Sequence, residues 1–296
     1  MQPSHAISVN NLLGESVTWR EHDQSLWWTD VQGKQLYRLQ YPAMDLTNYE
    51  VPERLASFGF VHGDRKKLIC AFESGFAFFW PTSGDIEWIR RHLIDLPGVR
   101  LNDGRVDRQG RFWAGSMVED GKQAGAPDAG MLYRIDQDLT ITPMETGLHI
   151  SNGLAWSLAS TTLYFCDSPL REIRAYEFDP ESGETTNRQS FYQFEEGAYP
   201  DGATVDAAGN LWSAIWSAGR VECIDQCGAR VGTIDLPVTQ PTCVCFGGPD
   251  LTTLFVTTAK IQLSEDQLTD QPLAGALLIY EKAGKGVPEN AFGSNK

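Results

Sequence analysis

The sequence predicts an all-β protein, a six-bladed β-propeller with a central metal site. One unit recurs along the chain: an aromatic-rich strand, a turn with Gly or Asp, and a second strand of alternating polar and apolar residues. The units follow one another at intervals of about 40 to 50 residues, which is typical of propeller blades. Helical periodicity is weak throughout the chain. Six units therefore predict six blades of about four strands each.

The strands of each unit can be assigned in chain order. The strands that open the units begin at Leu26, Lys67, Arg111, Leu163, Asn210 and Thr253. Their partners cover residues 36–39, 76–80, 131–135, 173–178, 220–224 and 276–280. Further strands lie at 12–19, 153–156 and 203–206. Strand-forming residues near the N-terminus could complete the last blade and close the ring.

We expect one propeller domain over residues 1–296, with loose ends at 1–8 and 285–296. The alternative is a pair of β-sandwich domains. We disfavour that alternative because no linker or change in composition divides the chain, and the spacing of the units continues evenly.

The composition restricts the partners of the protein. Hydrophobic residues make up 42% of the chain, which is enough for a large core, and the formal net charge is -15. Nucleic acids and anionic membranes attract clustered Lys and Arg, so we expect neither as a partner. The N-terminus lacks a basic and then apolar run, and no stretch of about 18 apolar residues occurs, so we expect a cytoplasmic protein.

The six cysteines do not form a recognisable framework. Their spacings do not match a zinc site, although the even count would also permit a disulfide. In a cytoplasmic protein of this size we expect reduced, mostly buried thiols. The cysteines are Cys70, Cys166, Cys223, Cys227, Cys243 and Cys245.

Polar residues recur where strands begin in different units. Glu15, Asn102, Asn152 and Asp201 each lie at or beside the start of a strand. In a propeller such positions converge on the central channel. Their oxygen atoms suit Ca²⁺, Mg²⁺, Mn²⁺, or a loosely held Zn²⁺ or Fe²⁺. Taken singly, Asn152 and Asp201 also fit simple Asn-Gly and Asp-Gly turns, and only the recurrence favours a site.

Other catalytic motifs are absent from the sequence. The five histidines form no H-E-x-x-H pattern, and neither a G-x-S-x-G elbow nor a P-loop occurs. His149 lies near Asn152, but a loop histidine with satisfied hydrogen bonds is the simpler interpretation. Trp216 follows a strand, where it could form the wall of a pocket.

Taken together, the motifs resemble the regucalcin/gluconolactonase family, also called senescence marker proteins. The matching segments extend over nearly the whole chain, in the same order. They include 13–19, 26–31, 100–117, 151–156, 164–168, 200–202, 209–212, 236–238, 246–248 and 254–259. The resemblance implies a six-bladed propeller with one metal in the channel.

The resemblance also implies roles for single residues. Glu15, Asn152 and Asp201 match the metal ligands of the family, and Asp201 also matches its general acid/base. Arg100 and Asn102 match residues that bind substrate hydroxyls. An acidic residue shortly after Met117 does the same, and it is either Asp120 or Glu119. Two departures, Val17 and 158–160, affect turns near the site but remove no ligand.

The resemblance implies a metal-dependent sugar lactonase, which hydrolyses an aldono-lactone of the gluconolactone, galactonolactone or pentonolactone type to the aldonic acid. The cofactor would be one divalent ion, namely Ca, Zn, Mn, Mg or Fe. The partner would be a small sugar lactone, and the protein a monomer or small homo-oligomer. The alternatives are a non-catalytic calcium-binding regulatory protein and a promiscuous esterase or phosphotriesterase.

Overall fold

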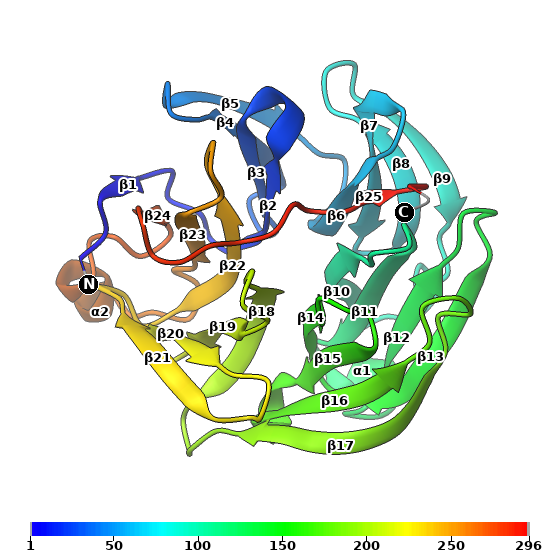
Figure 1. The fold of residues 1–296 in the computed structure, drawn as a ribbon. Coiled ribbons are helices and arrows are strands. Elements are labelled where there is room, and N and C mark those ends of the chain that lie inside the picture. Colours follow the sequence, from blue (N-terminus) through cyan, green and yellow to red (C-terminus); the bar gives the residue numbers. More distant parts are fainter. Residues whose placement is uncertain (1, 295–296) are drawn as a thin grey trace.

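The computed structural model describes residues 2–294 and has six β-sheets arranged in a ring around a central channel (Figure 1). The predicted all-β class and the six-bladed propeller are therefore confirmed. Each sheet is built on one antiparallel blade whose first strand lies at the channel. Helix is limited to short turns between strands.

The blades follow the chain in order. Blade 1 holds β2 (Gly14–Arg20), β3 (Ser25–Asp30), β4 (Gln35–Gln40) and β5 (Asp45–Glu50). Blade 2 holds β6 (Leu55–Val61), β7 (Asp64–Phe72), β8 (Gly75–Trp80) and β9 (Asp85–Arg90). Blade 3 holds β10 (Val99–Val106), β11 (Phe112–Val118), β12 (Gly130–Ile135) and β13 (Ile141–Leu148).

The second half of the ring repeats this order. Blade 4 holds β14 (Ser151–Trp156), β15 (Thr162–Asp167), β16 (Glu172–Phe178) and β17 (Thr185–Gln193). Blade 5 holds β18 (Tyr199–Val205), β19 (Leu211–Trp216), β20 (Arg220–Ile224) and β21 (Arg230–Asp235). Blade 6 holds β22 (Pro241–Gly247), β23 (Thr253–Thr258) and β24 (Leu277–Tyr280). The helices are α1 (Gly121–Ala124), α2 (Glu265–Asp270) and the 3₁₀ turns η1 (Glu21–Asp23) and η2 (Ser168–Leu170).

The N-terminus closes the ring. β1 (His5–Ile7) pairs antiparallel with β24 and supplies the fourth strand of blade 6. The chain thereby joins its beginning to its last blade by backbone hydrogen bonds, and β1 becomes the outer strand of that blade. The expectation of a loose end at residues 1–8 is wrong for this strand, while Met1 lies outside the described residues.

The C-terminal segment crosses one mouth of the channel, as the red ribbon in Figure 1 shows. Glu289 pairs with the guanidinium of Arg105, and Asn290 Nδ2 donates to the Val106 carbonyl over 3.3 Å. The segment ends in β25 (Ala291–Phe292), which pairs parallel with β6. Residues 285–294 are thus a strap over the channel and not the loose end that we expected, while 295–296 lie outside the described residues.

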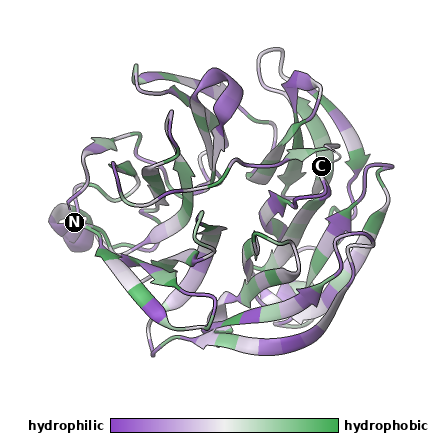
Figure 2. Cartoon of the chain, viewed as in Figure 1, coloured by the Kyte–Doolittle hydropathy of each residue, from purple (hydrophilic) through white to green (hydrophobic). Residues whose placement is uncertain are grey.

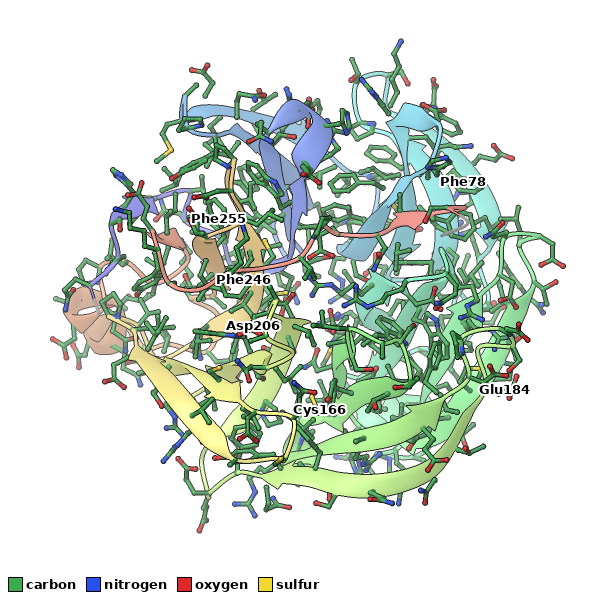
Figure 3. The ribbon with its side chains drawn as sticks, viewed as in Figure 1. Phe78, Cys166, Glu184, Asp206, Phe246 and Phe255 are labelled. Carbon is green, nitrogen blue, oxygen red and sulfur yellow. The ribbon has the colours of Figure 1, made fainter. Side chains whose placement is uncertain are left out.

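The core consists of layers between neighbouring blades. Six clusters of buried apolar side chains each join two adjacent blades, and together they run around the ring. In Figure 2 hydrophilic colours gather on the turns and on outer strands such as β17. In Figure 3 the buried Cys166 lies near the channel, whereas the charged Glu184 lies at the outer edge. The blades therefore hold the channel-facing strands on a rigid frame.

Candidate metal and substrate site

The innermost strand of each blade carries a β-bulge near its start. The pairing of β2 with β3 shifts between Glu15 and Thr18, and that of β14 with β15 shifts between Asn152 and Ala155. Similar shifts interrupt β6, β10, β18 and β22. A bulge inserts an extra residue into one strand and changes where its side chain points, which is frequent beside active sites. The residues in these bulges or directly before them include Glu15, Ala56, Asn102, Asn152, Asp201 and Thr242.

Four of these side chains line one pocket at the mouth of the channel that the strap leaves open. The pocket has a volume of about 270 Å³. Its polar lining consists of Glu15, Arg100, Asn102, Asn152, Ser168, Asp201 and Gln262. The structure thus brings together Arg100 and all four polar residues that the sequence places at strand starts. Trp216 lines the pocket as well, as its place after a strand predicted.

A chain of hydrogen bonds connects the polar residues across the blades. Arg100 Nη1 donates to Asn102 Oδ1 over 2.8 Å, and Asn102 Nδ2 donates to Asn152 Oδ1 over 2.9 Å. Asn152 Nδ2 then donates to Ser168 Oγ over 2.8 Å, and Ser168 donates to the Pro200 carbonyl over 2.7 Å. Because the last acceptor is a backbone carbonyl, the orientation of every amide before it is fixed. Asn152 Oδ1 keeps one lone pair for a further partner.

Arg100 is held from its other side by an acidic residue. Its guanidinium Nε donates to Glu119 Oε1 over 3.0 Å, and Arg54 binds the same carboxylate with two bonds of 2.8 Å. Burial alone would raise the pKa of Glu119, but the hydrogen bonds from Arg54 and the charge of Arg100 lower it below its usual value. Glu119 is therefore an anion that positions Arg100.

The two acidic residues after Met117 have different environments. Asp120 is the N-cap of α1: its carboxylate accepts from Lys122 N over 2.9 Å and from Gln123 N over 3.2 Å. Asp120 is half-buried, and none of its hydrogen bonds reaches Arg100. The structure thus places Glu119 next to the pocket residues and assigns Asp120 a local capping contact.

Negative charge is concentrated around the pocket. Burial and the neighbouring Asp103 raise the pKa of Glu15 to about 8. Burial and the charges of Glu15 and Asp103 raise the pKa of Asp201 well above its usual value. Burial also raises the pKa of Asp103, and burial lowers that of Arg100. Asp201 is buried, Glu15 and Asp103 are half-buried, and Arg100 is already paired with Glu119, so the pocket carries an excess of negative charge.

This charge distribution fits a divalent cation. Two carboxylates and an amide oxygen are hard donors of the kind that such ions prefer, and a cation would stabilise their ionised forms. Among residues 2–294, no three His, Cys, Asp or Glu side chains form a metal-binding group. The donor set in this pocket has an amide, Asn152, as its third member. The central metal site therefore stays a prediction that the donor set supports.

Sequence reasoning missed three residues of this arrangement. Ser168 ends the hydrogen-bond chain, Asp103 adds charge below the pocket, and Arg54 anchors Glu119. Asp103 follows Asn102 directly, and the bulge that turns both residues inward is the signal that alternation alone does not reveal. His149 is the satisfied loop histidine that we expected, because its Nδ1 lies 3.0 Å from Asp167 Oδ2.

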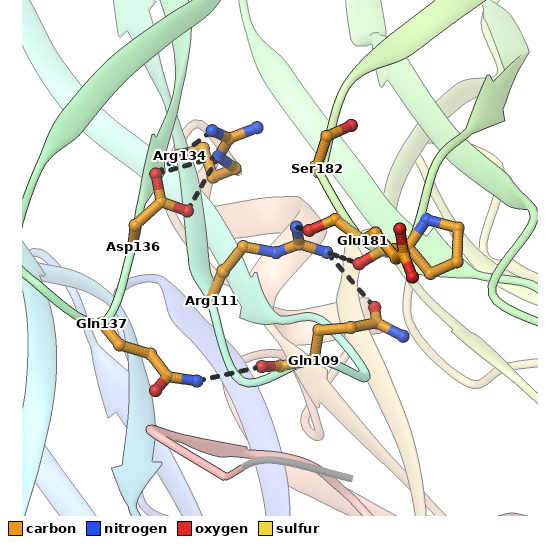
Figure 4. Close-up of a pocket in the computed structure, with 8 residues that line it drawn as sticks. Gln109, Arg111, Arg134, Asp136, Gln137, Glu181 and Ser182 are labelled. Atoms are coloured by element: carbon orange, nitrogen blue, oxygen red, sulfur yellow. Dashed lines mark hydrogen bonds and ion pairs between the residues drawn. The ribbon is translucent and has the colours of Figure 1, made fainter.

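A second pocket, of about 600 Å³, lies at the outer edge between blades 3 and 4 (Figure 4). Arg111 dominates it. The guanidinium of this residue binds Asp107 over 2.6 Å and donates to the carbonyls of Pro180 and Glu181 over 3.0 and 3.5 Å. The bonds to Pro180 and Glu181 connect blade 3 to blade 4. We therefore assign this pocket a structural role, although it is larger than the central one.

Two further predictions can be compared with the structure. All six cysteines are free, and only Cys227 is exposed. Within residues 2–294, no helix combines the length and apolar character needed to cross a membrane. The cytoplasmic location and the oligomeric state stay predictions.

Comparisons with known proteins agree with this architecture. Regucalcin from Danio rerio is 33% identical over 97% of this chain and 96% of its own. L-arabinolactonase from Azospirillum brasilense is 34% identical over 98% and 95%. The solved structure of a calcium-binding regucalcin from Agrobacterium tumefaciens superposes with a TM-score of 0.91, at 26% identity over 99% of this chain and 98% of its own. The family model described as SMP-30/Gluconolactonase/LRE-like region matches residues 13–260. The chain therefore belongs to the SMP-30/gluconolactonase/LRE-like family.

Proposed function

We propose that this protein is a metal-dependent sugar lactonase that hydrolyses an aldono-lactone to the aldonic acid. The observation that carries the proposal is the single pocket in which three oxygen ligands, Glu15, Asn152 and Asp201, lie beside the guanidinium of Arg100 and the side-chain amide of Asn102. Relatives named L-arabinolactonase, 6-deoxy-6-sulfogluconolactonase and pentonolactonase support a hydrolase that acts on a cyclic ester.

Glu15, Asn152 and Asp201 would hold the divalent ion. When bound, the ion would polarise the lactone carbonyl, lower the pKa of a water molecule and stabilise negative charge on the carbonyl oxygen. The identity of the ion is open among Ca, Zn, Mn, Mg and Fe, because oxygen donors accept all of them. Since the Agrobacterium regucalcin is described as calcium-binding, Ca²⁺ is the first ion to test.

The residues of the chain would divide the remaining work. Asp201 accepts a proton from the attacking water and returns it to the ring oxygen as the ester bond breaks. The guanidinium of Arg100 donates to substrate hydroxyls and orients the ring. Asn102 Oδ1 accepts from a hydroxyl, because both hydrogens of Asn102 Nδ2 are donated to Ser151 O and Asn152 Oδ1. Glu119 positions Arg100 for this contact, whereas Asp120 would act only by capping α1.

One alternative has support of its own. Regucalcins are among the relatives, and the name of one solved structure describes calcium binding, so a non-catalytic calcium-binding role is the second candidate. Arg100 and Asn102 favour the enzyme, because ion binding alone does not need a guanidinium and an amide in the same pocket.

The substitution Asp201→Asn tests the mechanism. It preserves the shape of the side chain but removes the carboxylate that would accept a proton. We expect loss of lactone hydrolysis by at least about 100-fold, as for other general bases, with an unchanged circular dichroism spectrum and melting temperature within a few degrees. Full activity in the variant would reject Asp201 as the acid/base.

A further inference from the structure

The pocket has an apolar wall on one side. Leu13, Trp216 and Ile261 line the pocket and pack together in one apolar cluster. Leu13 lies directly before β2 of blade 1, Trp216 ends β19 of blade 5, and Ile261 follows β23 of blade 6. Blade 6 lies across the ring from blade 3, which supplies Arg100 and Asn102. Arg100 and Asn102 therefore face an apolar surface across the channel.

Few polar groups interrupt this wall. Gln262 follows Ile261 but is exposed at the mouth, and Tyr199 contributes a half-buried phenol. Ser168 already donates to Pro200 and accepts from Asn152. A substrate hydroxyl pressed against the aliphatic side chains of Leu13 and Ile261 would lose its water without gaining a partner, which is unfavourable.

The volume of the pocket restricts the ligand to one ring. About 270 Å³ is below the range of roughly 300–1,000 Å³ that is usual for drug-sized ligands. With the carbonyl at the oxygen donors and the C2 and C3 hydroxyls at Arg100 and Asn102, the opposite edge of the ring faces the wall. That edge carries the ring oxygen and the carbon to which the terminal group is attached.

We propose that the protein prefers aldono-lactones with a methyl terminus, that is 6-deoxyhexonic lactones, over lactones with a hydroxymethyl or charged terminus. The inference rests on the proposed lactonase function. A methyl group gains binding free energy when it is buried against Trp216 and Ile261. A hydroxymethyl group loses a hydrogen bond to water at the same place. A sulfonate loses more hydration free energy, because none of the residues that form the wall is a cation.

The experiment compares matched lactones on the metal-loaded protein. The pairs are L-fuconolactone with L-galactonolactone and L-rhamnonolactone with L-mannonolactone, which differ only by the terminal hydroxyl. Apolar pockets discriminate against an added hydroxyl by up to about 100-fold. We expect kcat/KM to be about 10- to 100-fold higher for the methyl member of each pair, and a 6-sulfo lactone to be slower than either member.

Variants of the wall make the comparison specific. Ile261→Asn, and the milder Ile261→Thr, should reduce the preference to within about threefold by giving the terminal hydroxyl a partner. Ile94→Asn is the matched control, because Ile94 is 53% exposed and lies outside the pocket. It should leave the preference unchanged.

The outcomes separate the two proposals. No turnover of any lactone by the metal-loaded protein would overturn the proposed function and this inference with it. Turnover without a methyl preference would overturn the inference alone and keep the lactonase. A preference for hydroxymethyl lactones that disappears in Gln262→Leu would also overturn it, because Gln262 would then be the group that recognises the terminal hydroxyl.

Discussion

Glu119 offers a sharp test of how Arg100 is positioned. The Arg100 side chain is 4% exposed and that of Glu119 is 30% exposed, so their contact is largely shielded from water. Glu119→Gln preserves the size of the side chain but removes its negative charge. Arg100 would then remain enclosed with a weaker partner, while Arg54 would still pair with Glu73.

The size of the effect follows from the contacts. A hydrogen bond to a charged group contributes roughly 1.5–3 kcal/mol. Breaking an ion pair costs up to about 5 kcal/mol only where both partners are fully buried, which is not the case for Glu119. Since about 1.4 kcal/mol is a factor of ten, we expect kcat/KM to fall by about 10- to 150-fold. Arg100 would bind the substrate in the ground state and the transition state alike, so the loss should appear mainly in KM.

Asp120→Asn is the matched control. Asn is as good an N-cap residue as Asp, so α1 should be retained and the kinetics should change less than about twofold. The assay is steady-state lactone hydrolysis at saturating metal, with KM and kcat determined separately. A wild-type KM in Glu119→Gln would refute the positioning role, and a larger effect in Asp120→Asn would identify Asp120 as the substrate-side acid.

Two further predictions concern the metal and the stability of the fold. Ser168→Ala removes the acceptor of Asn152 Nδ2, and the loss of this supporting contact should weaken metal binding about 10- to 100-fold in calorimetry. The control Ser190→Ala, at an exposed position, should leave the affinity for the metal unchanged. Equal metal affinities of Ser168→Ala and the parent protein would contradict the role of the hydrogen-bond chain. Burial lowers the pKa of His92, whose ring stacks on Phe76. The folded state thus disfavours the protonated ring, and stability should fall as the pH drops below the unfolded pKa of about 6.5. Between pH 7 and pH 5 the melting temperature of His92→Phe should therefore fall by less than that of the parent protein. An equal fall in both proteins would contradict this explanation.

The fold could be predicted from the sequence because each blade repeats the same pattern. The strands assigned from Leu26, Arg111 and Thr253 correspond to β3, β11 and β23. The two chain ends were harder to assign, because β1 and β25 are short and gain their order from contacts with distant strands. β25 pairs with β6, more than two hundred residues earlier, and no local pattern encodes that pairing.

The candidate site could be predicted only in part. The recurrence of Glu15, Asn152 and Asp201 at strand starts indicated a shared location, and the pocket contains all three. The distinction between Glu119 and Asp120 could not be made, because it depends on which residue caps α1. Asp103 was given no role in the site, because it lies in a bulge where the alternation of the strand does not predict the direction of a side chain.

The central claim is that the metal held by Glu15, Asn152 and Asp201 makes this pocket a lactonase. The most direct measurement is acid release from a panel of aldono-lactones by protein that has been stripped with a chelator and resupplied separately with Ca²⁺, Zn²⁺, Mn²⁺, Mg²⁺ and Fe²⁺. Our account predicts no turnover by the stripped protein and restored turnover with at least one ion. Full turnover by the stripped protein, or none with any ion that calorimetry shows to be bound, would contradict it.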